Sequence, residues 1–126
     1  MPVKAEDQAV VEQVFQAMHA RAAGEKAMAA LFAPAATLIE PFSGQPRTHQ
    51  GKDEIMAWFR QAVTEMPPDM AIKMNRIDMD GDRVRADWTC TSSVFATPMK
   101  GSDYYRIRGG KIEHAEFVVT EMPPMD

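Results

Sequence analysis

The hydrophobic pattern of this 126-residue sequence changes at Pro67-Pro68, and that change limits the folds open to the chain. Before the two prolines, apolar residues mostly recur at steps of three and four, which is the spacing of one helix face. After them, apolar and polar residues alternate, as in strands whose side chains point in turn to opposite sides of a sheet. Helices first and strands second indicate an α+β fold.

Three helices are predicted before the prolines. The first ends at Gly24, and Pro34 closes the second because its ring cannot continue the helical hydrogen-bond ladder. A strand and a polar loop separate the second helix from the third. The predicted helices cover residues 6–23, 25–33 and 52–66, with the strand over 36–42 and the loop over 43–50.

Four consecutive strands are predicted after the prolines, with hairpin turn signals at Asp80-Gly81 and Gly109-Gly110. Residues 84–90 and 103–107 show the clearest alternation, and the last strand begins at Lys111. The fold class that follows is α+β: three N-terminal helices packed on a curved, mostly antiparallel sheet. Such a sheet folded over helices forms a cone, and its interior is either filled by side chains or left as an enclosed cavity.

Composition and charge exclude several classes of function. The net charge is −4 and no basic cluster appears, so a nucleic-acid partner is not expected. Cys90 is the only cysteine, which rules out a disulfide within the chain. The N-terminus lacks a signal-peptide pattern and no apolar run approaches the roughly 20 residues of a membrane span, so a cytoplasmic protein without a membrane partner is expected.

The segment 36–44, ATLIEPFSG, contains a carboxylate in an apolar setting. In an extended chain Leu38, Glu40 and Phe42 share one face. A charge is costly to bury, so Glu40 is either a functional group in a cavity or a structural acid paired with an arginine such as Arg47. Asp103 raises the same question on a later strand, where Arg106 is among the candidate partners.

Two segments resemble a known family. They are LFAPAATLIEPFSGQPRTHQG, which begins at Leu31, and GSDYYRIRGGKI, which begins at Gly101. Together with the order of elements, they are similar to the nuclear transport factor 2-like superfamily and, within it, to ketosteroid isomerase-like and SnoaL-like (polyketide cyclase-like) members. The resemblance covers nearly the whole chain and implies a single domain over residues 1–126.

The resemblance also implies catalytic roles. Glu40-Pro41 occupies the place of an aspartate-proline step whose acid is the general base of the isomerases. Asp103 matches a second aspartate that an apolar site keeps protonated, so that it donates a hydrogen bond to the oxygen that becomes negative. Glu40 would then move a proton next to a carbonyl, without a cofactor.

The sequence also departs from the isomerases. Their oxyanion-hole tyrosine on the first helix falls at Phe15, Gln16 or Ala17 here, and a second family tyrosine corresponds to Phe59. His19, one turn beyond Phe15, is either a replacement donor or a surface residue. His49 and His114 are expected to be solvated, and no spacing of histidines and carboxylates suggests a metal site.

The expected function is binding of a small hydrophobic carbonyl compound, steroid-like or polyketide-like, with proton transfer of the isomerase type. The alternatives are a non-catalytic ligand-binding domain and a polyketide cyclase or dehydratase-like enzyme. Relatives also imply a homodimer through the sheet face that carries Arg85, Tyr104 and Arg106. Apart from the acids, the candidate ligand-binding residues are Phe15, His19, Phe32, Phe42, Trp58, Phe59, Trp88, Tyr105 and Phe117.

Overall fold

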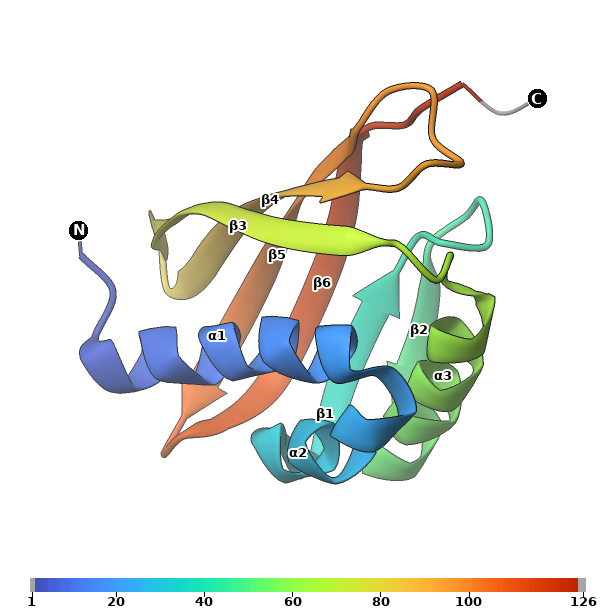
Figure 1. Cartoon of the computed structure of the whole chain (residues 1–126). Helices are drawn as coiled ribbons and strands as arrows, with labels where there is room; N and C mark the ends of the chain where they lie inside the picture. The colour runs from blue at the N-terminus through green and yellow to red at the C-terminus, as the bar shows by residue number, and fades with distance from the viewer. Residues whose placement is uncertain (1, 125–126) are drawn as a thin grey trace.

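A computed structural model of the chain describes residues 2–124. Its helical part consists of α1 (Ala5–Ala20), the short 3-10 helix η1 (Arg21–Gly24), α2 (Glu25–Leu31) and α3 (Lys52–Glu65). The helices are amphipathic and bury their apolar stripe against the sheet, as their spacing predicts. Figure 1 shows the strands curving above α1, with α3 packed beside β1 and β2.

Six strands form one mixed, curved sheet that does not close. Its order is β2-β1-β6-β5-β4-β3, and only the β1–β6 pair is parallel among the described pairings. The predicted fold class is therefore confirmed. The strands are β1 (Phe32–Glu40), β2 (Arg47–Gln50), β3 (Ala71–Asp80), β4 (Arg83–Thr91), β5 (Met99–Arg108) and β6 (Lys111–Glu121).

Two predicted boundaries were wrong. The second helix ends at Leu31, and Pro34 lies within β1. The segment predicted as a loop contains β2, which pairs antiparallel with β1 from Thr37↔Gln50 to Glu40↔Arg47. β2 has the sequence RTHQ and no apolar residue, so it lacks the alternation by which a strand is recognised. Its pairing with β1, which no local pattern reveals, makes it a strand.

Strand register decides which residues face the helices. Leu38 lies opposite His49 on β2 and Ala115 on β6, and Ala115 lies opposite Tyr105 on β5. Directly paired residues point to the same side of a sheet, so His49 shares the inner face with three fully buried residues. In the neighbouring row, Phe117 lies opposite Asp103. The inner face therefore carries polar groups among apolar ones.

Arg21 connects the helices. Its backbone has a positive φ of 57°, and its guanidinium donates hydrogen bonds to the carbonyls of Val63, Met66 and Pro67. Carbonyls at the end of a helix have no partner within that helix, so this side chain satisfies them. The contact fixes the end of α3 against η1, and α3 carries residues of the candidate site.

The opposite sheet face carries charged and aromatic side chains in contact with one another. The Arg83 guanidinium lies 4.5 Å from the centre of the Tyr104 ring, and Arg85 pairs with Asp87 at 2.9 Å. Dimerisation through this face stays a prediction.

Gly101 provides a test of the packing behind the site. A Cβ at this position would overlap the Val118 carbonyl and the Trp88 ring. We expect Gly101→Ala to lower the free energy of unfolding by about 1–3 kcal/mol, since the Val118 backbone cannot move aside as a flexible side chain would. Urea unfolding measures the change. Lys100→Ala, at the exposed neighbouring position, should stay within about 0.5 kcal/mol of the parent protein; equal stability of both variants would contradict the packing described.

Candidate functional site

Glu40 and Asp103 are the two buried carboxylates of residues 2–124, with 0% and 7% of their surface exposed. Both point to the inner face of the sheet. β6 lies between their strands, so two strand spacings place their Cα atoms about 10 Å apart. Ile39 pairs with Glu116, which brings Glu40 beside Phe117. Phe117 therefore lies between the two acids.

Three donors surround Glu40. Its Oε1 accepts a hydrogen bond from the Phe42 backbone N–H at 2.8 Å, and its Oε2 lies 2.9 Å from both Arg47 Nε and His49 Nε2. The β1–β2 register creates this arrangement, because Arg47 is opposite Glu40 and His49 is two residues further along the same face. Pairing with a guanidinium explains how a fully buried carboxylate is tolerated. The structure therefore contains the ion pair between Glu40 and Arg47, which the sequence left as one of two alternatives.

Asp103 has a different environment. Its Oδ1 accepts a hydrogen bond from Trp88 Nε1 and its Oδ2 one from the Tyr105 hydroxyl, both at 2.8 Å. Burial raises the pKa of Asp103 to about 7, against the opposing effect of these two bonds. The pKa of the Tyr105 phenol is raised well above 10 by burial and by the neighbouring acid. Below about pH 7, Asp103 therefore holds a proton.

An aromatic cluster joins the two acids. It consists of Phe42, His49, Trp58, Tyr105 and Phe117, with the Phe117 ring centre 5.9 Å from that of Trp58, 6.4 Å from Phe42 and 6.3 Å from Tyr105. The His49 ring lies 6.1 Å from that of Trp58. Phe42 is 45% exposed, so one side of the cluster reaches solvent.

The remaining predicted ligand-binding residues lie outside this cluster. Trp88 contacts Asp103 from β4, whereas Phe15, Phe32 and Phe59 belong to the buried core. His19 is exposed on α1, where its Nε2 accepts a hydrogen bond from the Ile72 backbone N–H at 2.9 Å. It therefore links α1 to β3.

His49 is the site residue that the sequence did not indicate. It was expected in a solvated loop, but it lies on a strand with 17% of its side chain exposed. A strand interpretation of RTHQ would have placed Arg47 and His49 on one face at i and i+2. No local pattern shows that this face meets Glu40.

The sequence matches the family model of the SnoaL-like domain over residues 11–115. This chain belongs to the SnoaL-like domain family. None of the curated proteins matches it at a significant level.

Solved structures share the fold of this SnoaL-like domain. A proposed SnoaL-like polyketide cyclase from Jannaschia sp. superposes with a TM-score of 0.77 at 11% identity, over 95% of this chain and 89% of that one. A proposed polyketide cyclase from Sinorhizobium meliloti gives 0.71 at 20% identity, over 86% and 93%. A proposed ketosteroid isomerase from Kribbella flavida gives 0.70 at 18% identity, over 96% and 84%.

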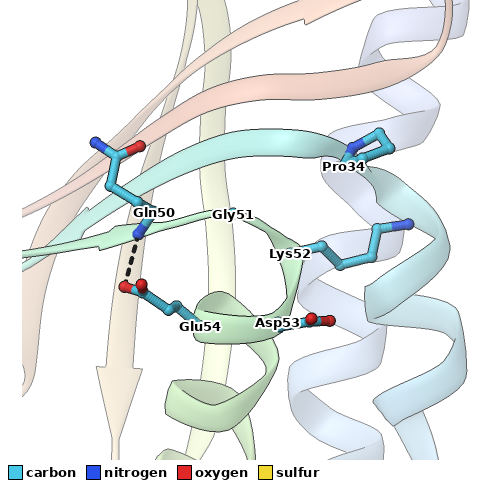
Figure 2. Close-up of a pocket in the computed structure, with 6 residues that line it drawn as sticks. All are labelled: Pro34, Gln50, Gly51, Lys52, Asp53 and Glu54. Carbon is cyan, nitrogen blue, oxygen red and sulfur yellow. Dashed lines mark hydrogen bonds between the residues drawn. The ribbon is translucent and has the colours of Figure 1, made fainter.

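The two hollows described in this SnoaL-like domain are not lined by either acid. The larger, of about 450 Å³, opens at the start of α3, where Asp53, Glu54 and Lys52 surround it and the Gln50 N–H donates to Glu54 at 3.0 Å (Figure 2). The smaller, of about 140 Å³, lies at residues 91–98. A ligand that reached both acids would have to displace rings of the aromatic cluster.

In residues 2–124, no group of three or more histidine, cysteine or acidic side chains is arranged to hold a metal ion. None of the helices in this range is long and apolar enough to cross a membrane.

The protonated state of Asp103 predicts a pH-dependent stability. Between about pH 4 and 7 the folded chain keeps a proton that the unfolded chain releases, so unfolding becomes easier as pH rises. We expect the parent protein to lose up to about 1.4 kcal/mol per pH unit relative to Asp103→Asn in this range, and to show no further relative change above it. Urea unfolding of both proteins from pH 4 to 9 measures the difference, and parallel curves would contradict a protonated Asp103.

Proposed function

We propose that this SnoaL-like domain binds a hydrophobic carbonyl compound at the aromatic cluster and transfers a proton at the carbon next to the carbonyl group. One observation carries the proposal: two buried carboxylates with opposite surroundings lie at the two ends of one cluster. Glu40 has a guanidinium at 2.9 Å, whereas the hydrogen-bond partners of Asp103 are uncharged. Burial raises the pKa of Asp103 to about 7, so this end of the cluster can hold a proton, while the other end carries an ion-paired carboxylate.

Asp103 forms the acidic end of the proposed site. Trp88 and Tyr105 donate to its two oxygens and hold the carboxyl group in place. A neutral carboxyl group also has a hydrogen to donate, and a substrate carbonyl oxygen is a suitable acceptor. As a proton leaves the neighbouring carbon, negative charge grows on that oxygen, and a donor in a water-poor site stabilises it strongly.

The Glu40 end supplies the base. The C–H bond of the substrate breaks, its proton moves to this end, and its electron pair forms an enolate whose oxygen faces Asp103. Return of the proton to a different carbon gives an isomer. The reaction needs no oxidant or reductant, because it only moves a proton from one carbon of the substrate to another. The names of the related structures, polyketide cyclase and ketosteroid isomerase, agree with a carbonyl compound as substrate.

One observation favours non-catalytic ligand binding as the second candidate. Phe117 lies between the acids, and the Phe42 ring stacks near Trp58 at 6.5 Å with a partly exposed surface. An apolar ligand could displace the Phe42 ring and bind to the cluster without contacting both acids.

Proton exchange tests the proposed function. Incubation with a panel of enones and β-keto esters in D₂O, followed by NMR, should show deuterium entering next to the carbonyl faster than in protein-free buffer. Asp103→Leu is similar in size but has no hydrogen to donate, so exchange should fall by about 100-fold to 1000-fold. Ring closure of a substrate with two carbonyls would identify the cyclase alternative.

The control for this experiment is Asp82→Asn. Asp82 is 78% exposed and pairs with Arg106 on the surface at 3.4 Å, so the substitution should leave exchange unchanged. Quenching of tryptophan fluorescence by the same compounds in the parent protein but not in a Trp58→Phe variant, without any catalysed exchange, would contradict proton transfer and support ligand binding alone.

A further inference from the structure

We infer that His49 carries the transferred proton and that Glu40 is a positioning residue for its imidazole ring. This inference rests on the proposed function and specifies the group that acts as its base. It starts from the contact of 2.9 Å between His49 Nε2 and Glu40 Oε2, which the β1–β2 register creates.

Glu40 itself is poorly placed to take a proton from a substrate. Its carboxylate is fully buried, and its oxygens already accept hydrogen bonds from the Phe42 N–H and from Arg47. Neither of these two groups can act as an acceptor, so both must donate. With His49 as the third partner, one of about four lone-pair positions of the carboxylate remains. A substrate carbon would have to approach that position past the surrounding donors.

The same contacts fix the hydrogen on the imidazole ring. An ionised carboxylate only accepts hydrogen bonds, so Nε2 of His49 must be the nitrogen that carries the hydrogen. The lone pair of neutral His49 is then on Nδ1. In residues 2–124, the contact through Nε2 is the one hydrogen bond described for this ring. Nδ1 is therefore free to accept a proton.

The position of the ring agrees with this role. His49 lies on the inner face with 17% of its side chain exposed, and its ring is tilted by 36° against that of Trp58. The cluster to which Trp58 belongs is the proposed binding surface. The imidazole is therefore partly exposed beside that surface, whereas Glu40 is fully buried.

Two charged side chains face the His49 ring. The charged groups facing His49 are Glu40 on β1 and Arg47 on β2, while α3 contributes the uncharged Trp58. Arg47 is 48% exposed, so solvent screens its charge, whereas the buried carboxylate at 2.9 Å is screened much less. When the substrate C–H bond breaks, an N–H bond forms at Nδ1, and the resulting imidazolium pairs with Glu40 through a charge-assisted hydrogen bond. The proton later returns from Nδ1 to another carbon.

NMR of ¹⁵N-labelled protein tests the arrangement without any substrate. We expect neutral His49 to carry its hydrogen on Nε2, and Glu40→Gln to shift the ring toward the Nδ1–H form, because the amide of glutamine can donate to Nε2. An Nδ1–H form in the parent protein would overturn the inference, since Nδ1 would then have no lone pair for the substrate proton.

Exchange kinetics give the second test. His49→Gln retains a side-chain N–H that can donate to Glu40 but has no basic nitrogen, so we expect deuterium exchange to fall by about 100-fold or more. His49→Ala should lose as much and recover in part when imidazole is added. The matched control is His114→Gln, since His114 pairs with Arg106 and Thr37 on the opposite sheet face and should leave exchange unchanged.

The outcomes separate this inference from the proposed function. Exchange by the parent protein together with near-normal exchange in His49→Gln would assign the base to Glu40 and overturn the inference alone. No exchange by the parent protein on any compound would overturn both. Urea unfolding of each variant shows whether a loss of exchange reflects a loss of folding.

Discussion

The pairing of Glu40 with Arg47 is the interaction on which the site depends. A buried carboxylate without a partner would cost several kcal/mol, and the β1–β2 hairpin offsets part of that cost by placing a guanidinium directly opposite it. The same register places His49 within hydrogen-bond distance of the acid. Loss of the hairpin would therefore unpair the acid and release the histidine together, so the stability of the edge of the sheet and the chemistry of the site are coupled.

The alternation of side chains along a strand explains why Glu40 and Asp103 have different partners. Arginines were available near both in the sequence, and the alternation of strand residues decides which acid receives one. Arg106 is three residues from Asp103, so it points to the opposite face, where it pairs with Asp82. Arg108 pairs with Glu113. Asp103 is consequently left with two uncharged donors, and burial controls its protonation.

The sequence predicts those parts of the site that depend on short-range alternation. The shared face of Leu38, Glu40 and Phe42 can be read directly, and the hairpin signal at Gly109-Gly110 sets β6 as one of the two partner strands of Asp103. β2 could not be predicted, because four polar residues become a strand only through pairing with β1. The sequence could not decide whether the aromatic rings fill the cone or line a cavity in it, because this depends on contacts between side chains from α3, β5 and β6 that are distant in sequence.

Phe42 combines two roles that bear on how the proposed ligand would reach the acids. Its backbone N–H holds Glu40, while its ring contacts Trp58 and Phe117 and remains 45% exposed. An aromatic pair contributes about 0.5–1.5 kcal/mol beyond the area it buries, so moving this one ring costs far less than moving the interior rings. Rotation about the Phe42 side-chain bonds leaves its backbone hydrogen bond intact. In the proposed site the ring would therefore move aside for a ligand while the contacts of Glu40 with the Phe42 N–H and with His49 keep their geometry.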